Sequence, residues 1–547
     1  MDPQFLPPSP KSPDLDIVKK QSSPANPVLF EAFEWHSPAD HKHWRRLQRA
    51  LPDLAAIGIT GLWLPPGSKA KDAGSNGYDI YDAYDLGEFD QKGTIPTKWG
   101  TKRDLVNLAV ECRSHNVGLI WDAILNHRAF ADSTEIVKVV EVNPRNRNED
   151  VTEPFDIVAW TRFDFAARQG KYSTFTYNKN HFNGTDWNQR TGKRAIYRFV
   201  ENGKNWAQDV GKLQGNADYL MLENLDYTNA EVIKETTDWG TWIVQELGLK
   251  GFRLDAVQHY SWNFANNWSQ YLRQQNGGDL LCVGEFWNGD VNVLLKWMDN
   301  MSPEFKLYDV PLMYRIARLS QGEDTDLREV FRDTLVERRP NNAVVSPSIL
   351  RSEPSLTIQT FIRIHDTQTG QDMDTPIRHS FTPHAYGLLL LRLGGHPCVF
   401  FGDLYGITGP YPEPPTCWGK LPGLILARKL YAYGPQTDYF ERSDCIGWTR
   451  HGDSASPDGC AVIMSWTEGT GIEHCAPYLR MSVGSEHAGE VWTDVLGFEW
   501  SAVTIDRDGN GRFPCQRNSM ACFVSEAATG REKFPVRFNS DFHDLVV

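Results

Sequence analysis

Three short apolar segments of the chain each end in an acidic residue, and this pattern constrains the fold more than any other feature of the sequence. Residues 251–255, 281–285 and 358–366 end in Asp255, Glu285 and Asp366. In a β/α barrel the carboxyl ends of the parallel strands lie on one face, where catalytic groups collect. The three segments therefore predict a barrel that presents three acids on the same face.

Eight segments in all have the length and composition of buried strands. They are residues 28–33, 61–64, 118–123, 251–255, 281–285, 307–310, 356–362 and 397–401. Most are separated by stretches long enough for a helix, and this alternation predicts a parallel sheet. Eight strand–helix units predict an α/β fold, a closed (β/α)8 TIM barrel, which we assign to residues 28–127 and 230–443.

The stretch between the third and fourth strands is too long for a connecting loop. It covers residues 128–229 and contains short alternating runs such as residues 195–200, so we expect an inserted β-rich domain. Beyond residue 443 the pattern changes to β-type runs at 459–465, 490–493 and 520–524. These predict a C-terminal antiparallel β-sandwich over residues 444–526, followed by a tail at 527–547.

Composition limits the classes of binding partner and the cellular compartment that we expect. The net charge of −14 argues against nucleic acid or an anionic membrane as a partner. Residues 1–27 lack the apolar core of a secretory signal, so we expect a disordered leader on a cytoplasmic, monomeric protein; a secreted protein with a processed or engineered start would look the same. The nine cysteines are spread singly, which favours reduced thiols but leaves open a disulfide within residues 417–522.

Several motifs together carry a resemblance to a known family. They are Gly77-Tyr78-Asp79-Ile80-Tyr81-Asp82-Ala83-Tyr84-Asp85-Leu86-Gly87-Glu88-Phe89, Asp122-Ala123-Ile124-Leu125-Asn126-His127, the three segments that end in acids, and Phe400-Phe401-Gly402-Asp403-Leu404-Tyr405-Gly406. With these motifs the chain resembles the α-amylase superfamily, glycoside hydrolase family 13, and within it the liquefying bacterial type and its fungal intracellular relatives.

The resemblance implies an α-glucan substrate and endo-acting, retaining hydrolysis of α-1,4-glucosidic bonds in starch, glycogen or maltooligosaccharides. Two alternatives stay open: an intracellular α-glucan transglycosylase, and a weakly active glucan-binding regulator. By the resemblance Asp255 is the nucleophile, Glu285 the general acid and base, and Asp366 the acid that holds sugar hydroxyls. The two reacting carboxyl groups of a retaining enzyme lie about 5–5.5 Å apart, which neighbouring barrel strands can provide.

The surroundings of the acids carry further expectations. Arg253 stands two residues before Asp255 and would keep that carboxyl ionised, whereas the environment of Glu285 should raise its pKa. The resemblance also assigns substrate contacts to a wider group: Tyr78, His127, Arg253, Gln258, His259 and His365.

Two departures from the family pattern, covering three positions, lie close to these residues. Gln258 stands where lysine is common. Arg363 and Ile364 stand where an aspartate–asparagine pair usually precedes the His-Asp motif. The arginine adds a charge that could perturb Asp366 or bind a different group, so both departures bear on turnover, product pattern and the preference for polymeric starch.

The resemblance further implies one structural Ca²⁺ between the barrel and the inserted domain. Its ligands would be Asn126, Asp218, Asn224 and the backbone carbonyl of His259, and all are oxygen donors of the kind that calcium prefers. Position 224 is Asn where the bacterial relatives have Asp, so we expect weaker binding. Asn183, Ala207 and Thr228 replace the aspartates of a second calcium and a sodium site, which we expect to be absent.

Overall fold

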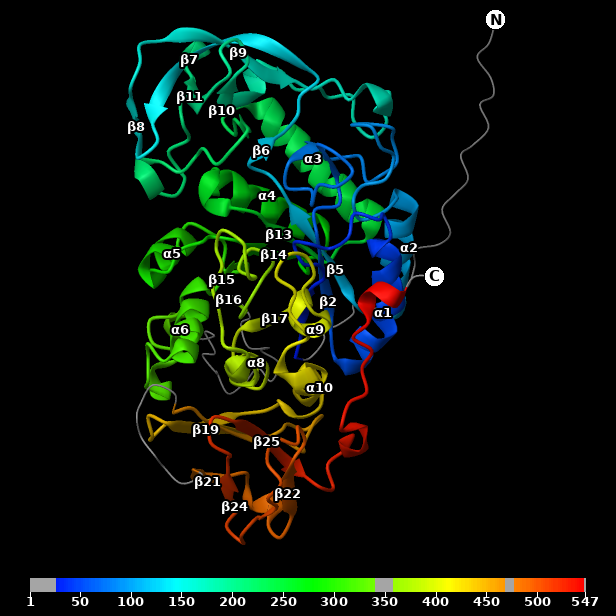
Figure 1. Ribbon diagram of the computed structural model, residues 1–547, viewed down its shortest axis with the longest axis vertical. Helices are drawn as coiled ribbons and strands as arrows, with labels where there is room; N and C mark the ends of the chain where they lie inside the picture. Colours follow the sequence, from blue (N-terminus) through cyan, green and yellow to red (C-terminus); the bar gives the residue numbers. More distant parts are fainter. Residues whose placement is uncertain (1–25, 340–357, 468–476, 546–547) are drawn as a thin grey trace, which may run out of the picture.

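A computed structural model describes residues 26–339, 358–467 and 477–545 of the chain. The predicted leader up to residue 25, the start of the predicted seventh strand at 356–357 and Cys475 lie outside the described residues. Figure 1 shows three parts stacked along the long axis: an inserted set of antiparallel strands, a central barrel, and a second set of antiparallel strands near the C-terminus.

The central part is a closed barrel of parallel strands, as predicted. The strands follow the order β1-β17-β16-β15-β14-β13-β5-β2 and return to β1. Nearly every residue in them is buried, because helices cover the outside while side chains fill the inside. Their bounds are β1 (Leu29–Glu31), β2 (Gly61–Leu64), β5 (Gly118–Ala123), β13 (Gly251–Leu254), β14 (Leu281–Gly284), β15 (Phe305–Tyr308), β16 (Ile358–Thr360) and β17 (His396–Phe400).

Among the described residues, six of the eight observed strands differ from the prediction by one or two residues at one or both ends. The sixth was expected at residues 307–310, but β15 ends at Tyr308 because Asp309 caps the next helix and accepts a hydrogen bond from the Leu312 N–H. Within the described residues β16 ends at Thr360, so Asp366 lies in a turn six residues further on rather than at the strand end. This turn places Asp366 and His365 near the acids that follow β13 and β14.

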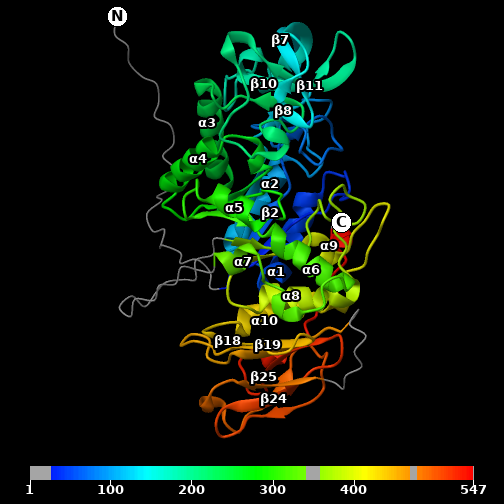
Figure 2. The same ribbon diagram turned by 90° about the vertical axis from the view of Figure 1, so that its left-hand side faces the viewer.

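Helices surround the barrel, as Figure 2 shows from the side. The side chains of Thr101, Asn229, Ser261 and Asp290 cap α2, α3, α4 and α5 by accepting backbone N–H hydrogen bonds. The helix bounds are α1 (His43–Ile57), α2 (Lys102–Ser114), α3 (Ala230–Leu247), α4 (Trp262–Gln275), α5 (Val291–Met298), α6 (Val310–Gln321), α7 (Leu335–Arg338), α8 (Thr382–Leu390), α9 (Phe401–Tyr405) and α10 (Leu421–Tyr431).

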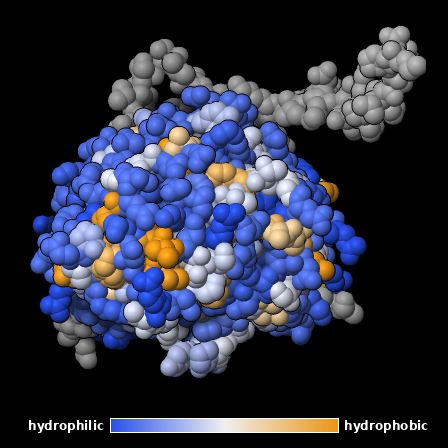
Figure 3. Space-filling view, turned by 90° about the horizontal axis from the view of Figure 1, so that it is seen from above, coloured by the Kyte–Doolittle hydropathy of each residue, from blue (hydrophilic) through white to orange (hydrophobic). Residues whose placement is uncertain are grey.

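The inserted segment between β5 and α3 folds into its own antiparallel sheet, as the length and alternating runs of this stretch predicted. Its order is β6-β12-β10-β11-β7-β8, with β9 paired to β7. Seen from this end of the molecule, hydrophilic residues dominate the surface and apolar residues form only small separate patches (Figure 3). The strands are β6 (His127–Arg128), β7 (Ser133–Asn143), β8 (Asn146–Asp150), β9 (Phe155–Arg162), β10 (Phe182–Asn188), β11 (Lys193–Phe199) and β12 (Glu223–Leu225); a separate pair, β3 (Lys69–Ala70) and β4 (Ile80–Asp82), precedes them.

The C-terminal part contains two antiparallel sheets around a core of their own. One has the order β18-β19-β20-β25-β22-β23, and the other pairs β21 with β24. Ile463, Met481 and Phe513 lie in the core between them. The strands are β18 (Gln436–Tyr439), β19 (Cys445–Arg450), β20 (Cys460–Ser465), β21 (Tyr478–Ser482), β22 (Val491–Asp494), β23 (Val503–Thr504), β24 (Asn510–Pro514) and β25 (Met520–Ser525).

The tail after β25 returns to the barrel. It ends beside α1 in Figure 1, and the Phe542 ring lies 4.8 Å from the Phe401 ring and 5.0 Å from the Tyr405 ring, centroid to centroid. The eight cysteines among the described residues are buried free thiols. None of the helices in the described ranges is both long and apolar enough to cross a membrane.

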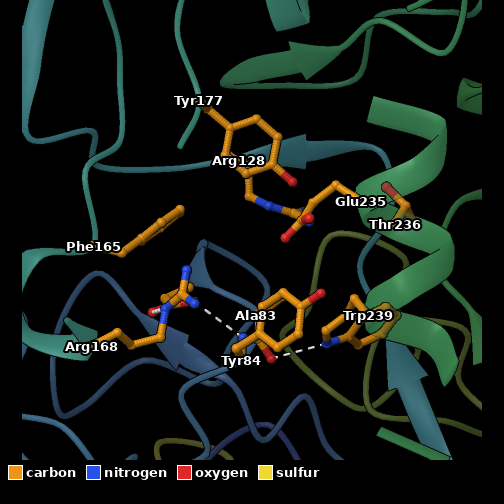
Figure 4. Close-up of a pocket in the computed structure, with 10 residues that line it drawn as sticks. Ala83, Tyr84, Arg128, Phe165, Arg168, Tyr177, Glu235, Thr236 and Trp239 are labelled. Atoms are coloured by element: carbon orange, nitrogen blue, oxygen red, sulfur yellow. Dashed lines mark hydrogen bonds and ion pairs between the residues drawn. The ribbon is translucent and has the colours of Figure 1, made fainter. Parts of the chain in front are cut away.

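A small pocket of charged and aromatic side chains lies where the inserted domain meets the barrel (Figure 4). There Arg168, from the inserted segment, donates from Nε to Asp82 Oδ2 at 2.8 Å. Both side chains are almost fully buried. Burial raises the pKa of Asp82 above its usual value, against the attraction of Arg168. The inserted domain and the barrel are thus joined by an ion pair that is shielded from solvent.

We expect Arg168→Met to lower the free energy of unfolding by about 3–5 kcal/mol, because it leaves the Asp82 carboxylate buried without a counter-charge. Urea denaturation followed by circular dichroism would measure the change. The double variant Asp82→Leu/Arg168→Met should recover most of the loss, and Arg328→Met, which removes a partly exposed ion pair with Asp326, should have little effect. Equal losses from Arg168→Met and Arg328→Met would contradict the assignment.

Candidate active site

The three acids collect on the barrel edge that faces the inserted domain. Asp255 follows β13 directly, Glu285 follows β14 directly, and Asp366 lies in the turn after β16. These strands are parallel, and β13 pairs with β14 through Leu254 and Gly284. Their carboxyl ends therefore meet at the same edge, as the sequence predicted.

Arg253 holds the centre of this site together. It lies on β13 level with Asp122 of β5, and its Nη1 donates to Asp122 Oδ1 at 2.7 Å and to Asp255 Oδ1 at 2.8 Å. Its Nη2 donates to Glu285 Oε2 at 2.6 Å. One buried guanidinium thus serves three carboxylates, which brings Asp255 and Glu285 close together.

The backbone contributes to the same arrangement. Ala256 has a left-handed conformation with φ of 47°, which is strained for a residue that carries a Cβ. In this conformation its N–H donates to Glu285 Oε2 at 3.1 Å. The turn after Asp255 therefore helps to orient the second acid.

Burial has a larger effect on the two central acids than Arg253 has. It raises the pKa of Asp255 to about 8, against the lowering effect of the Arg253 charge. Burial also raises the pKa of Glu285, as expected for a group that must keep a proton. Arg253 thus favours the ionised form of Asp255, as expected, but burial outweighs it, because the one cation is shared by three carboxylates.

His365 and Asp366 form a second charged group beside the first. His365 Nδ1 donates to Glu31 Oε1 at 2.6 Å, and Nε2 lies 3.2 Å from Asp366 Oδ2. Burial lowers the pKa of His365, but the two carboxylates outweigh it and raise the pKa to about 10. Burial favours the neutral form of Asp366, yet the charge of His365 brings its pKa below the ordinary value. Asp366 is therefore an anion held by a histidine cation.

Aromatic rings line the floor between the two groups. The Tyr78 ring stacks on His365 with centroids 5.2 Å apart, and its hydroxyl donates to Asp122 Oδ2 at 2.9 Å. The Trp35 ring is nearly parallel to both, 6.0 Å from Tyr78 and 5.8 Å from His365. The site thus offers flat apolar surface next to its acids, which suits the apolar faces of a sugar ring.

Sequence reasoning missed three residues of this site. Asp122 was quoted within a motif but given no role, although it accepts hydrogen bonds from Arg253, Tyr78 and Trp63. Glu31 ends β1 and is fully buried, so it was an acid at a strand end that the same rule should have found. Trp35 follows β1 in a loop, and no periodic pattern marks it.

The departures from the family pattern point away from the acids. Arg363 Nη1 donates to Glu413 Oε2 at 2.8 Å, and its Nε lies 3.5 Å from Asp403 Oδ1. Ile364 is fully buried. The charge of Arg363 is thus taken up by two carboxylates of the segment after β17, which favours the second alternative, that the arginine binds a different group. The side chain of Gln258 is buried, and its Oε1 accepts no hydrogen bond.

The predicted calcium ligands also come together, behind the acid site. Asn126 Nδ2 donates to Asn224 Oδ1 at 3.0 Å and to the His259 carbonyl at 2.7 Å, with the Asp218 carbonyl oxygen at 3.4 Å. The His259 ring does not join the three acids; it donates from Nδ1 to the Ala217 carbonyl of the inserted segment at 2.5 Å. No three His, Cys, Asp or Glu side chains gather into a metal site within the described ranges, so a cation here would depend mainly on amide and carbonyl oxygens, with Asp218 as the one carboxylate residue among the predicted ligands.

The hydrogen bonds of His127 test whether a cation fits. Burial lowers the pKa of His127 to about 4, so the ring is neutral and carries one N–H. Nε2 donates to the Tyr78 carbonyl at 2.8 Å, which leaves the lone pair of Nδ1 facing Asn126 Oδ1 at 3.1 Å. Two acceptors repel, and a half-turn of the Asn126 amide removes the conflict. The amide oxygen then faces the oxygens of Asn224, His259 and Asp218, a set that a calcium ion would stabilise.

The sequence is similar to those of known proteins over most of its length. The family described as "Alpha amylase, catalytic domain" matches residues 43–482. The α-amylase of Bacillus licheniformis is 39% identical over 502 residues, which cover 91% of this chain and 93% of that protein. The cytoplasmic α-amylase of Escherichia coli (strain K12) is 35% identical over 514 residues, which cover 92% of this chain and 99% of that protein.

The fold agrees with a solved structure as well. The crystal structure of an Anoxybacillus α-amylase superposes with a TM-score of 0.59 at 16% identity, covering 92% of this chain and 98% of that one. At this identity the likeness shows the fold alone, a barrel with additional β domains. The sequence relatives go further, and with the match to the catalytic domain they show that this chain belongs to the α-amylase family of enzymes.

Proposed function

We propose that the chain is an endo-acting, retaining hydrolase of α-1,4-glucosidic bonds, with starch, glycogen and maltooligosaccharides as substrates. One observation carries the proposal: the Arg253 guanidinium holds Asp255 and Glu285 side by side, with the His365–Asp366 pair next to them. Retaining glycosidases require two carboxyl groups about 5–5.5 Å apart, one to attack and one to donate a proton. The α-amylase relatives support the bond type.

The proposed reaction has two steps. First, the Glu285 acid gives its proton to the glycosidic oxygen while Asp255 bonds to the anomeric carbon, and the bond to the leaving sugar breaks. In the second step Glu285 takes a proton from water, the water oxygen bonds to the anomeric carbon, and Asp255 is released. Between them the acids need one proton at the start. The raised pKa values of both supply it, and positive charge developing on the sugar favours ionised Asp255.

The other groups would bind and orient the reacting sugar. Asp366, kept anionic by His365, can accept hydrogen bonds from two sugar hydroxyls. Tyr78 offers its ring as a platform, and the neutral His127 is hydrogen-bonded to the Tyr78 carbonyl. Glu31 is a positioning residue, because it acts through His365. Gln258 remains a proposed contact on the leaving-group side, although its unpaired Oε1 is buried and the side chain would have to rotate to meet a sugar hydroxyl.

The two alternatives have less support. A glucan-binding regulator with little turnover was motivated by Arg363 and Ile364, but neither contacts an acid of the site. A transglycosylase would use the same covalent intermediate and pass the sugar to another glucan instead of water. Product sizes separate hydrolysis from transfer. We also propose a monomer in the cytoplasm, by analogy with the cytoplasmic α-amylase of Escherichia coli.

We propose one structural Ca²⁺ held by Asn126, Asp218, Asn224 and the His259 carbonyl, with no second calcium or sodium. Burial raises the pKa of Asp218 to about 7, although Asn183 and the Ala207 N–H both donate to its Oδ2. A bound cation would favour the charged form of this carboxylate. It would tie the inserted domain to the barrel, and no step of the proposed reaction passes through it.

Replacing Glu285 with Gln should lower the rate on maltopentaose by about 100- to 10,000-fold, because the general acid and base is lost. Reducing-end release and product sizes over time would measure it. Glu231→Gln, an exposed glutamate on α3, is the matched control and should behave as wild type. Equal activity of Glu285→Gln and wild type would contradict the assigned role, and products longer than the donor would indicate transfer.

Calcium should raise the melting temperature and a chelator should lower it, because the ion binds only the folded chain. Asn224→Asp adds a carboxylate to the ligands and should strengthen calcium binding, whereas Asp218→Asn should remove the response. Differential scanning calorimetry with calcium, magnesium or chelator would measure these shifts. An unchanged melting temperature for wild type and for Asn224→Asp under all conditions would rule the site out.

Arg363→Met should reduce the free energy of unfolding by about 3–5 kcal/mol, because it leaves Asp403 buried without its cation. The turnover number on maltopentaose should stay within about a factor of three, since no group that touches the sugar changes. Arg318→Met, which removes a partly exposed pair with Asp324, serves as the control. A large loss of turnover without loss of stability would instead place Arg363 in the catalytic machinery.

A further inference from the structure

Two tryptophans are displayed on the surface at the junction of the barrel and the C-terminal sheets. Trp500 is 86% exposed, more than any other large apolar side chain in the described ranges, and Trp418 is 56% exposed. Trp418 comes just before α10, and Trp500 lies in the loop between β22 and β23. Phe498, two residues from Trp500, has its ring 6.0 Å from that of Trp418. We name these three residues the aromatic patch.

The loop that carries Trp500 is rigidly built. The Asp494 carboxylate accepts hydrogen bonds from the backbone N–H groups of Leu496, Phe498 and Glu499 at 2.7–3.0 Å. The Glu499 carboxylate accepts from the N–H groups of Trp500 and Ser501 in turn. The position of Trp500 is therefore fixed by the fold, and its exposure does not result from a loose loop.

The backbone around Trp418 is strained. Cys417 and Trp418 both have left-handed backbone conformations, with φ of 54° and 51°, which is strained for residues other than glycine. The Trp418 ring gains little burial in return. Lys420 fixes the neighbouring segment by donating to the carbonyls of Leu496 at 2.6 Å and Gly497 at 2.9 Å. Strain that yields an exposed ring points to a ligand outside the chain.

We propose that the aromatic patch is a second binding site for α-glucan chains. The inference rests on the proposed function for its choice of ligand. Flat aromatic rings suit the apolar faces of glucose units. Polar groups lie close by: the Ser501 hydroxyl follows Trp500 and donates to Glu499, and Gln516, from the segment after β24, donates to the same carboxylate. The Ser501 oxygen and the remaining N–H groups can meet sugar hydroxyls. A stable protein interface buries about 800 Å² on each partner, far more apolar surface than three rings with polar neighbours provide.

The aromatic patch lies away from the three acids, so it would bind glucan at a separate place. The acids lie on the barrel edge that faces the inserted domain, whereas the patch joins the barrel to the C-terminal sheets, and α10 lies next to these sheets in Figure 1. A polymer bound at the patch would stay near the active site and raise its local concentration there. The patch should therefore matter for glycogen and starch and not for short maltooligosaccharides.

The test compares Trp418→Ala/Trp500→Ala with Tyr478→Ala, which removes another exposed aromatic ring of the C-terminal part. All are made in the Glu285→Gln background, so that the polymer is not cleaved, and run in native gels that contain glycogen. The double variant should bind glycogen about fivefold more weakly or worse, the loss expected for two stacking rings. Tyr478→Ala should bind as the parent does. With Glu285 restored, all should cleave maltopentaose equally.

Trp500→Ala alone guards against a folding defect, because the ring contributes little to the interior; it should lose part of the affinity at an unchanged melting temperature. Undiminished glycogen binding by the double variant would overturn the inference. So would a wild type that dimerises through the patch, seen by sedimentation, with glucan binding unaffected. If wild type cleaves no glucan yet binds glycogen through the patch, the proposed function fails while the second site stands.

Discussion

The active site depends on one buried cation. Arg253 contacts Asp122, Asp255 and Glu285 from the centre of the barrel mouth, and the three carboxylates could not be buried together without it. Removing such a partner typically costs several kcal/mol, because an uncompensated charge stays behind in a low-dielectric site. The same sharing sets the chemistry. One positive charge is shared by three carboxylates, so burial raises the pKa of both Asp255 and Glu285. A proton held by this pair is what the proposed retaining reaction needs at its start.

A second charged group works alongside the first. Glu31, His365 and Asp366 form a row in which the histidine cation keeps the outer acid ionised. At one end of the barrel, Asp255 and Glu285 share Arg253 and have raised pKa values, whereas Asp366 lies beside His365 and has a lowered pKa. Environment, and not residue type, separates the roles of three carboxyl groups.

The sequence predicted the barrel well because its signals are local. A buried parallel strand is a short apolar run, and eight of them could be counted. The acids after β13 and β14 followed from the same rule. What failed depended on contacts between distant segments: the raised pKa of Asp255 comes from burial by the whole barrel, and the partners of Arg363 lie 40 and 50 residues further along the chain. Trp35 was missed because a loop residue has no period to reveal it.

Arg363 shows how a charge can replace a family residue near an active site without disturbing it. Its guanidinium lies against the Phe400 ring, with its cation 5.8 Å from the ring centroid, and ties Glu413 to the turn that carries His365 and Asp366. Glu413 also accepts a hydrogen bond from Thr369 at 2.5 Å, so both sides of the turn are tied to the segment after β17. The arginine stabilises the turn from behind and leaves the sugar side to the residues that the rest of the family pattern supplies.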